Sequence, residues 1–286
     1  MIERSEYPPG VPCWVDTGQP DPEAAARFYG GVFGWELEDQ MPPDSDARYY
    51  MARLRGRDVA AVGSQFPEGT PVVWSTYVCV ENADATAAKA QEAGGRVLSE
   101  PFDVFDAGRM GVLADTEGAA ISIWQPGRTI GAQLVNEPGT WNFSEMNSRD
   151  PERAKAFYGT VFGWEADEIG MGDIMMFRRP GYGDFLESID PGTRERMSGV
   201  GAPPGFEDAV AWLAPMHSPQ FSDDTPPHWS ITFAVDDADA AAAKASELGG
   251  TVLMPPTDLP WVRQTILRDP QGAVFTASRF VPPETG

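Results

Sequence analysis

Apolar residues along the chain fall into short runs that are separated by turn residues. Residues 11–17 and 74–80 are rich in aromatic and β-branched side chains, which is the composition of β-strands. Residues 83–93 and 238–248 are alanine-rich and end at a pair of glycines, so they predict helices. An Asp-Pro-Glu sequence suits the first turn of another helix at residues 21–30, which the pair Gly30-Gly31 stops or bends.

Further short strands complete this pattern in the first half of the chain. A hairpin across Gly56-Arg57 and three later runs account for residues 49–54, 59–62, 96–99, 110–114 and 119–124. The order β-α-β-β-β therefore occurs twice in the first half, and the second half repeats it.

An internal repeat indicates that the chain is a duplication. Residues 28–36 (FYGGVFGWE) return as residues 157–165 (FYGTVFGWE), at an offset of 129. Later matches lie 155 residues apart, so the second half carries 26 additional residues, which we expect to flank its binding site. The expected organisation is a first domain at 1–129, a linker at 130–140, and a second domain at 141–286 with an insertion near 181–208.

Composition and charge narrow the class of protein. The 286 residues suffice for two domains, and a hydrophobic content of 42% excludes a disordered chain. A net charge of −22 argues against nucleic acid and against an anionic membrane surface as partners. No apolar run has the length of a membrane span or a signal core, so we expect a cytoplasmic monomer or homodimer. Cys13 and Cys79 lie in apolar, strand-like surroundings and are expected to be buried thiols.

Two motifs carry a resemblance to a known family. Phe-Tyr-x-x-Val-Phe-Gly-Trp follows the first helix of each half, and Val-Asp-Asp-x-Asp-Ala precedes the second helix of the second half. With this order of elements, the chain resembles the vicinal oxygen chelate superfamily of glyoxalases, bleomycin-resistance proteins and extradiol dioxygenases. It is most similar to a two-domain actinobacterial "hydroxylase-like" group that opens with Pro-x-Trp-Val-Asp. The resemblance implies an α+β fold of tandem duplicated domains, with four βαβββ units forming two cup-shaped sheets that carry helices on their convex faces.

Metal-using members of this superfamily hold the ion with three ligands on the concave face of a cup. The resemblance places those positions on the first strand, the strand before the second helix and the last strand of each domain. The residues there are Trp14, Ser75 and Ser122 in the first domain, and Phe143, Ser230 and Thr276 in the second. None is a His, Glu, Asp or Cys, the side chains that bind Zn²⁺ or Fe²⁺ well. We therefore expect no metal and no other cofactor.

Strand alternation predicts which other side chains share these faces, because every second residue points the same way. Asp16 accompanies Trp14 on the first strand, and Glu145 accompanies Phe143 on the equivalent strand. Aromatic rings, hydroxyls and one carboxylate on each face suit a flat, partly hydrophobic small molecule. The predicted substrate-binding residues are Trp14, Phe143, Ser75, Tyr77, Ser122, Trp124, Ser230, Thr232 and Thr276.

Glu145, His228 and Asp16 are the candidate catalytic residues. A carboxylate and an imidazole on one face can perform acid–base chemistry, such as dehydration, cyclisation or isomerisation. The interpretation is a metal-independent enzyme of the lyase, cyclase or isomerase type, acting on a polycyclic, polyketide-like aromatic metabolite in a natural-product pathway. One alternative is a non-catalytic protein that sequesters a drug-like metabolite for self-resistance. The other is a metal-dependent glyoxalase or dioxygenase, against which the six missing ligands argue.

Each candidate also has a purely structural interpretation. Trp14 and Phe143 can fill a collapsed cup, and Glu145 and Asp16 can be solvated carboxylates at strand ends. His228 can be a hydrogen-bonded residue of the rim. Glu145 and His228 share a cup only if the two units of a domain pair with each other, and pairing within or across domains fits the sequence equally well.

Overall fold

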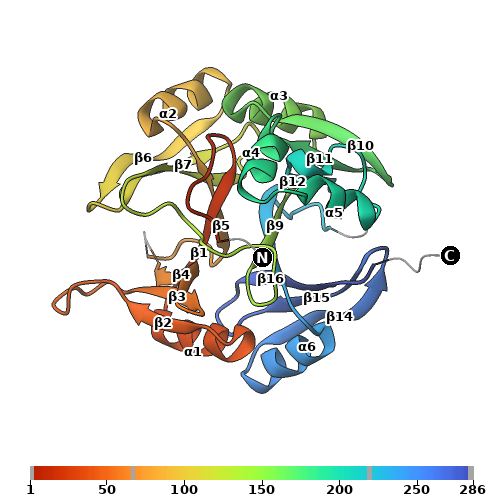
Figure 1. Ribbon diagram of the computed structural model, residues 1–286. Helices are drawn as coiled ribbons and strands as arrows, with labels where there is room; N and C mark the ends of the chain where they lie inside the picture. Colours follow the sequence, from red (N-terminus) through yellow and green to blue (C-terminus); the bar gives the residue numbers. More distant parts are fainter. Residues whose placement is uncertain (1–2, 66–67, 218–220, 283–286) are drawn as a thin grey trace.

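The computed structural model of this protein describes residues 3–65, 68–217 and 221–282, and each half of this part of the chain forms one eight-stranded sheet (Figure 1). The strands of the first sheet lie in the order β2 (Glu36–Asp39), β3 (Tyr49–Leu54), β4 (Arg57–Ser64), β1 (Pro12–Gln19), β5 (Trp74–Cys79), β8 (Ala120–Pro126), β7 (Gly108–Ala114) and β6 (Arg96–Val104). The second sheet repeats this order with β10 (Glu165–Met171), β11 (Ile174–Arg178), β12 (Ala209–Pro215), β9 (Trp141–Ser148), β13 (His228–Ala234), β16 (Val274–Phe280), β15 (Val262–Arg268) and β14 (Thr251–Leu259).

The hydrogen-bond register shows that the two βαβββ units of each half pair with one another. β1 runs antiparallel to β5 at the centre of the first sheet, and β9 runs antiparallel to β13 in the second. Each of these central strands is also parallel to the last strand of its own unit, as β1 is to β4 and β13 is to β16. Glu145 on β9 and His228 on β13 therefore belong to the same sheet.

Both sheets are open. Within the described residues, β2 and β6 lie at opposite ends of the first sheet without pairing, and β10 and β14 are the corresponding edges of the second. The α+β fold of tandem duplicated domains is confirmed. The sheets, which were expected to be cup-shaped, are open sheets in which the pairing stops at these edge strands. The helices of the βαβββ units cover one face of each sheet. The opposite face, called helix-free below, carries none of these helices, although Phe206 of the segment between β11 and β12 packs on it in the second sheet.

The first helices of the two halves begin and end in the same way. α1 (Pro22–Phe33) and α3 (Pro151–Phe162) each start after an aspartate whose side chain accepts a hydrogen bond from a backbone N–H of the first turn. They end at Gly34 and Gly163, whose φ angles of 72° and 73° are left-handed and suit glycine. The expected end of α1 at Gly30 is wrong, because the helix continues until Phe33 is packed in the core.

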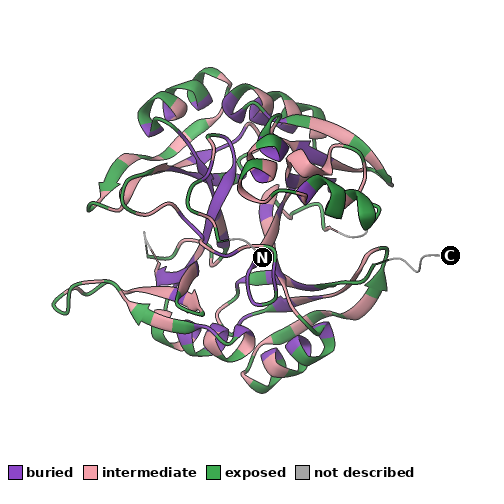
Figure 2. Ribbon diagram, viewed as in Figure 1, coloured by how far each residue is buried: buried purple, intermediate pink, exposed green. Residues whose placement is uncertain are grey.

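The helices join the two halves into one body. α1 lies beside α6 (Ala238–Glu247), and α2 (Ala83–Glu92) lies beside α3, so each helix pair combines one helix from each half (Figure 1). The buried residues form two clusters, and each cluster takes residues from both halves. Buried stretches of the chain gather toward the middle of the molecule (Figure 2). Cys13 and Cys79 are buried free thiols in the first of these clusters, as expected.

Two equivalent hydrogen-bond networks cross between the halves. The Tyr29 hydroxyl on α1 donates to Asp269 of the second half over 2.8 Å, and the Tyr158 hydroxyl on α3 donates to Asp115 of the first half over the same distance. The indole N–H groups of Trp74 and Trp229 donate to these two tyrosine oxygens. The repeated Phe-Tyr motif thus supplies the contacts that hold the duplicated halves together.

The chain between β11 and β12 has no counterpart in the first half. It forms α4 (Tyr182–Ile189), α5 (Thr193–Gly199) and the short 3₁₀ helix η1 (Phe206–Asp208) beside the second sheet (Figure 1). Its end approaches the opposite edge of that sheet, because a Cβ placed on Gly201 would lie 3.0 Å from the ring of Trp261 in the β14–β15 turn. The chain then returns to the sheet through η1, which leads directly into β12.

None of the helices in the described residues combines the length and the apolar character that are needed to cross a membrane.

Candidate functional site

The helix-free face of each sheet carries the side chains that the sequence pattern predicted for it. On β9, Ser144 and Met146 are buried on the helix-bearing side, so Phe143 and Glu145 point to the opposite side. We call the helix-free side of the first sheet the first face (Trp14, Asp16, Tyr49, Ser75, Tyr77, Ser122 and Trp124). The helix-free side of the second sheet is the second face (Phe143, Glu145, Trp212, His228, Ser230, Thr232 and Thr276).

The first face is filled by its own side chains. Trp14, Tyr77 and Trp124 are only 6–8% exposed, and Ser122 is 3% exposed. Asp16 accepts hydrogen bonds from the hydroxyl groups of Tyr77 at 2.9 Å and of Tyr49 at 3.1 Å. Burial raises the pKa of Asp16 to about 6, although the two hydrogen bonds oppose this change. The carboxylate of the first face is therefore satisfied within the protein.

The second face is more open, and its carboxylate has no partner in the part of the chain that the structure describes. Phe143, Glu145, Ser230, Thr232 and Thr276 are all partly exposed. Among the described residues, the Glu145 side chain forms no hydrogen bond and no ion pair, and removal from water raises its pKa to about 7. Such a carboxyl group exists in both protonation states near neutral pH, which is the property that acid–base catalysis uses.

An aromatic cluster borders Glu145. Trp212 on β12 lies directly opposite Glu145 in the strand register, and its ring is 5.0 Å from that of Phe143. Phe206 of η1 lies 6.0 Å from both rings. Neither Trp212 nor Phe206 was among the predicted site residues. The register of β12 against β9 would have indicated Trp212, whereas Phe206 lies in the segment without a repeat and had no such signal.

His228 is on the second face but is not hydrogen-bonded to Glu145. It is the first residue of β13, where it pairs with Asn147, and its Nδ1–H donates to the Pro226 carbonyl at 2.8 Å. Ser230 is the direct partner of Glu145 in the register, and its hydroxyl accepts a hydrogen bond from the Asn147 amide at 3.1 Å. His228 therefore occupies the rim of the face, two positions along the strand from Ser230.

The remaining predicted residues divide between the two sheets. Thr232 pairs with Phe143 on one side and with Thr276 on the other, so these three side chains are neighbours on the second face. Asp16 lies on the other sheet, and it can therefore not act in the same site as Glu145. The two carboxylates are equivalent positions of two separate faces.

The donor set of neither face fits a resident metal. The six positions at which metal-using relatives hold their ion carry two aromatic rings, three serines and one threonine, and neutral hydroxyls compete poorly with water for Zn²⁺ or Fe²⁺. Across the described ranges, no three His, Cys, Asp or Glu side chains lie close enough together to hold an ion.

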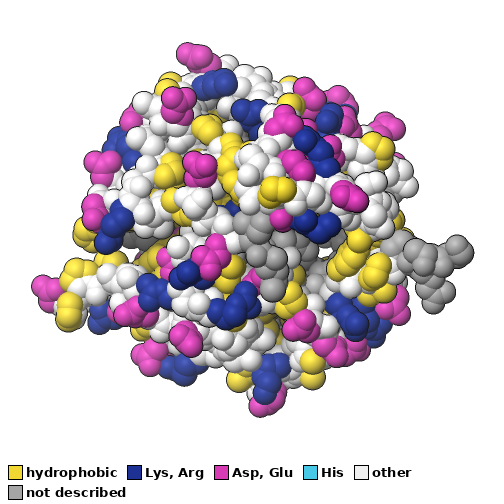
Figure 3. All heavy atoms as spheres, viewed as in Figure 1, with side chains coloured by type: hydrophobic (Ala, Val, Ile, Leu, Met, Phe, Trp, Pro, Cys, Tyr) yellow, Lys and Arg dark blue, Asp and Glu magenta, His cyan; other side chains and the backbone are white. Residues whose placement is uncertain are grey.

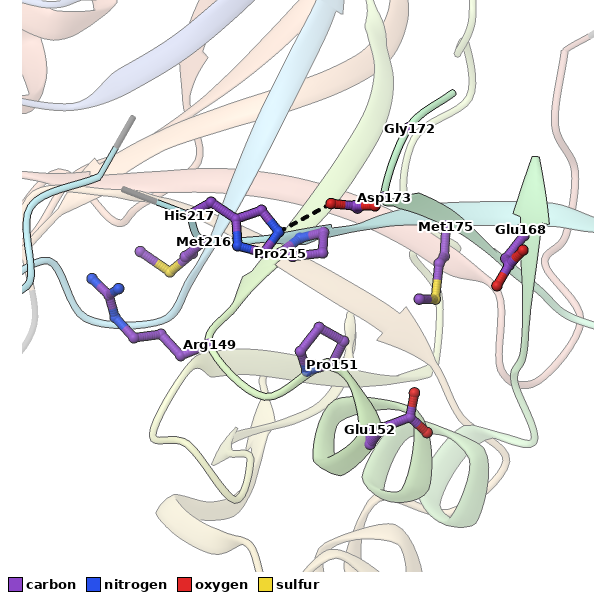
Figure 4. Close-up of a pocket in the computed structure, with 10 residues that line it drawn as sticks. All are labelled: Arg149, Pro151, Glu152, Glu168, Gly172, Asp173, Met175, Pro215, Met216 and His217. Carbon is purple, nitrogen blue, oxygen red and sulfur yellow. Dashed lines mark ion pairs between the residues drawn. The ribbon is translucent and has the colours of Figure 1, made fainter. Parts of the chain in front are cut away.

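A surface hollow of about 380 Å³ lies elsewhere, between the start of α3 and the β10–β11 turn (Figure 4). His217 and Asp173 form an ion pair at 3.3 Å across it, and both side chains are more than 60% exposed. Arg149 on its rim donates to the carbonyl groups of Ser222 and Thr225. The hollow includes none of the predicted site residues.

Charges on the rest of the visible surface are mixed in sign. On the face drawn in Figure 3, acidic and basic side chains alternate over most of the molecule. Ion pairs near the surface include Arg109 with Asp84 and Arg263 with Asp239. These pairs have a small effect on stability in water.

The paired βαβββ units and the repeated motif define a duplicated α+β fold. The chain matches the model of the Glyoxalase/Bleomycin resistance protein/Dioxygenase superfamily over residues 15–123 and 142–276, and it belongs to that superfamily.

Two curated relatives match over nearly the whole chain. A protein of Mycobacterium tuberculosis (strain CDC 1551 / Oshkosh) named "Putative glyoxylase CFP32" is 39% identical over 99% of both chains. The anthracycline biosynthesis protein DauV of Streptomyces sp. (strain C5) is 32% identical over 95% of this chain and 94% of the relative. Among solved structures, a Mn(II)-bound glyoxalase from Novosphingobium aromaticivorans covers 95% of this chain with a TM-score of 0.59 at 13% identity, which supports the fold alone.

Proposed function

We propose that the second face binds a polycyclic aromatic metabolite and that Glu145 performs acid–base chemistry on it. One observation carries the proposal: Glu145 is a carboxyl group with a pKa of about 7 and no hydrogen-bond partner among the described residues, and it borders the cluster of Phe143, Trp212 and Phe206. Aromatic rings at this spacing can stack against a flat ligand, while the carboxyl group contacts its polar edge.

The relatives support this class of ligand. DauV and DnrV, which match this chain at 32% identity, are anthracycline biosynthesis proteins by name. A role of this chain in the biosynthesis of a polycyclic aromatic natural product is consistent with the aromatic second face. The relationship to a protein named as a glyoxylase adds no metal chemistry here, because the donor sets of both faces do not suit a metal.

Chemically, Glu145 would remove a proton from an acidic C–H or O–H group of the ligand and return it at another position. A pKa near 7 allows both steps at neutral pH, which suits dehydration, cyclisation or isomerisation. The hydroxyl groups of Ser230, Thr232 and Thr276 line the same face and can donate to a ligand carbonyl. His228 would act from the rim through Nε2, since Nδ1 is engaged by Pro226.

A binding protein without catalysis is the second candidate function. It is favoured by the position of His228, which forms no hydrogen bond with Glu145 and leaves that carboxyl group without a second titrating group as a direct partner. In that case the aromatic cluster alone carries the function. The two candidates differ in whether Glu145 is needed for turnover, and they share the same binding site.

Trp212→Ala is expected to weaken binding of a polycyclic aromatic probe such as 1,8-dihydroxyanthraquinone by about tenfold or more, because a central stacking surface is lost. Titration followed by fluorescence or calorimetry measures the effect. Phe102→Ala removes an aromatic side chain that is 46% exposed on β6 and serves as the matched control. Equal affinity of wild type and Trp212→Ala would show that the ligand does not bind at the second face.

We also expect the protein to work without a metal. Protein purified without chelator should contain only substoichiometric Zn, Fe, Mn or Ni, because the six candidate positions offer hydroxyls and rings instead of anionic or imidazole ligands. Elemental analysis measures this directly. Near-stoichiometric metal, together with an activity that EDTA removes and the same metal restores, would contradict the proposal.

A further inference from the structure

We propose that the ligand presents a phenolic hydroxyl to Glu145, in the place where the first face carries the side chain of its own Tyr77. This inference rests on the proposed function, because it specifies the chemistry of the ligand that binds to the second face. It follows from a comparison of the two faces, which are copies of one another within a single chain.

Strand register makes the comparison residue by residue. Asp16 lies opposite Ala61 and Ser75, and Glu145 lies opposite Trp212 and Ser230, so the two carboxylates occupy equivalent positions. Tyr77 is the partner of Trp14, and Thr232 is the partner of Phe143, so Thr232 stands where the first face has Tyr77. In the same way, Met176 is equivalent to Met51, and Ile174 is equivalent to Tyr49.

The replacements remove both phenol groups from the second face. In the first face, Asp16 accepts hydrogen bonds from the hydroxyls of Tyr77 and Tyr49, and the Trp14 indole donates to Tyr49 in turn. In the second face, Thr232 has a shorter side chain without a ring, and Ile174 has no donor. The two phenol hydroxyls of the first face therefore have no counterparts at Glu145, which holds the strand position equivalent to Asp16.

A carboxyl group in such surroundings gains most from a ligand that restores the missing donor. Leaving a partly buried polar group without a hydrogen bond is costly, and a hydrogen bond to a charged acceptor is among the stronger polar contacts. A phenol combines this donor with a flat ring that can stack against Phe143 and Trp212, whose own rings lie 5.0 Å apart. A carboxylate-bearing ligand would instead be repelled by Glu145.

The Trp212 indole strengthens the argument for an oxygen-bearing aromatic ligand. Within the described chain its N–H has no hydrogen-bond acceptor, although it borders Glu145 in the register. Paired positions of β12 and β9 thus carry a donor and an acceptor that have no partners among the described residues. An aromatic ligand with a hydroxyl and a second oxygen offers a partner to each group.

Three naphthalene probes of equal ring size test the inference on the wild-type protein. We expect 1-naphthol to bind about tenfold or more tightly than 1-methoxynaphthalene, because methylation removes only the donor. Calorimetry or quenching of tryptophan fluorescence measures the affinities. If the methyl ether binds as well as 1-naphthol, or if 1-naphthylmethylamine binds most tightly, the phenol is not the recognised group. If none of the three binds, the proposed aromatic site fails as well.

Thr232→Tyr tests the same idea from the protein side. The introduced phenol should occupy the ligand position and bond to Glu145, so binding of 1-naphthol should be lost. Thr251→Tyr makes the same substitution at an exposed position of β14 and is the control for the added ring. Circular dichroism confirms folding of both variants. If the folded Thr232→Tyr protein binds 1-naphthol with the affinity of the wild type, the inference is overturned. Weaker binding by this variant supports the inference when the wild type also prefers 1-naphthol to its methyl ether.

Discussion

Asp269→Ala is expected to destabilise the protein by about 3 kcal/mol or more, because several hydrogen bonds to one buried carboxylate are lost together. One oxygen of Asp269 accepts from the Tyr29 hydroxyl and from the Gln19 amide, both at 2.8 Å and both across the boundary between the halves. The other oxygen accepts from the backbone N–H groups of residues 271–273. Removing the side chain leaves the hydroxyl of Tyr29 and the amide of Gln19 buried without this acceptor.

Thermal unfolding measures the effect of Asp269→Ala, with an expected fall of the midpoint of roughly 6–12 °C for a chain of this size. Asp237→Ala is the matched control. Asp237 also accepts from backbone N–H groups, at the start of α6, but it is exposed and contacts only its own half, so the expected cost is about 1 kcal/mol. If the two variants lose the same stability, the bonds between the halves contribute little.

The duplicated fold could be predicted from the sequence, while the role of its repeated motif could not. The motif at residues 28–36 and its copy gave the α+β architecture and the four units. Its tyrosine, however, bonds to an aspartate 240 positions away in the other half, and no local pattern indicates such a contact. The end of α1 was misplaced for a related reason: Phe33 is needed in the core between the halves, so the helix continues past Gly30.

Strand alternation identified most of the helix-free faces, because the period of two is a property of the backbone. Trp14 and Asp16 share one face, and Phe143 and Glu145 share the equivalent face. Alternation could not show whether side chains of the protein itself fill each face. Whether aromatic rings close a face depends on tyrosines from neighbouring strands, and the first face has Tyr49 and Tyr77 where the second has smaller or apolar residues. Trp212 was missed because its equivalent in the first half is an alanine.

Glu145→Gln is expected to lower turnover of the natural substrate by roughly 10²–10⁴-fold and to leave binding of the ring system intact, because glutamine cannot transfer the proton.

The same substitution should raise the stability of the free protein above neutral pH. Burial raises the pKa of Glu145 from 4.5 to about 7, so the folded state disfavours the ionised form. The contribution of Glu145 to the free energy of unfolding is therefore fully present below pH 4.5, and it is lost as the pH rises through 7.

Because glutamine is neutral at every pH, the variant escapes this loss. We expect Glu145→Gln to match the wild type near pH 4 and to exceed it by about 1–3 kcal/mol at pH 8, the upper limit being the full pKa shift without relief from solvent. Denaturant unfolding at the two pH values measures the difference. Asp16→Asn should give no such gain, since it weakens the bonds from Tyr49 and Tyr77. If Glu145→Gln lowers turnover and raises stability, Glu145 is a catalytic group that destabilises the folded protein. If turnover is unchanged and stability rises by the same amount, the binding protein is favoured.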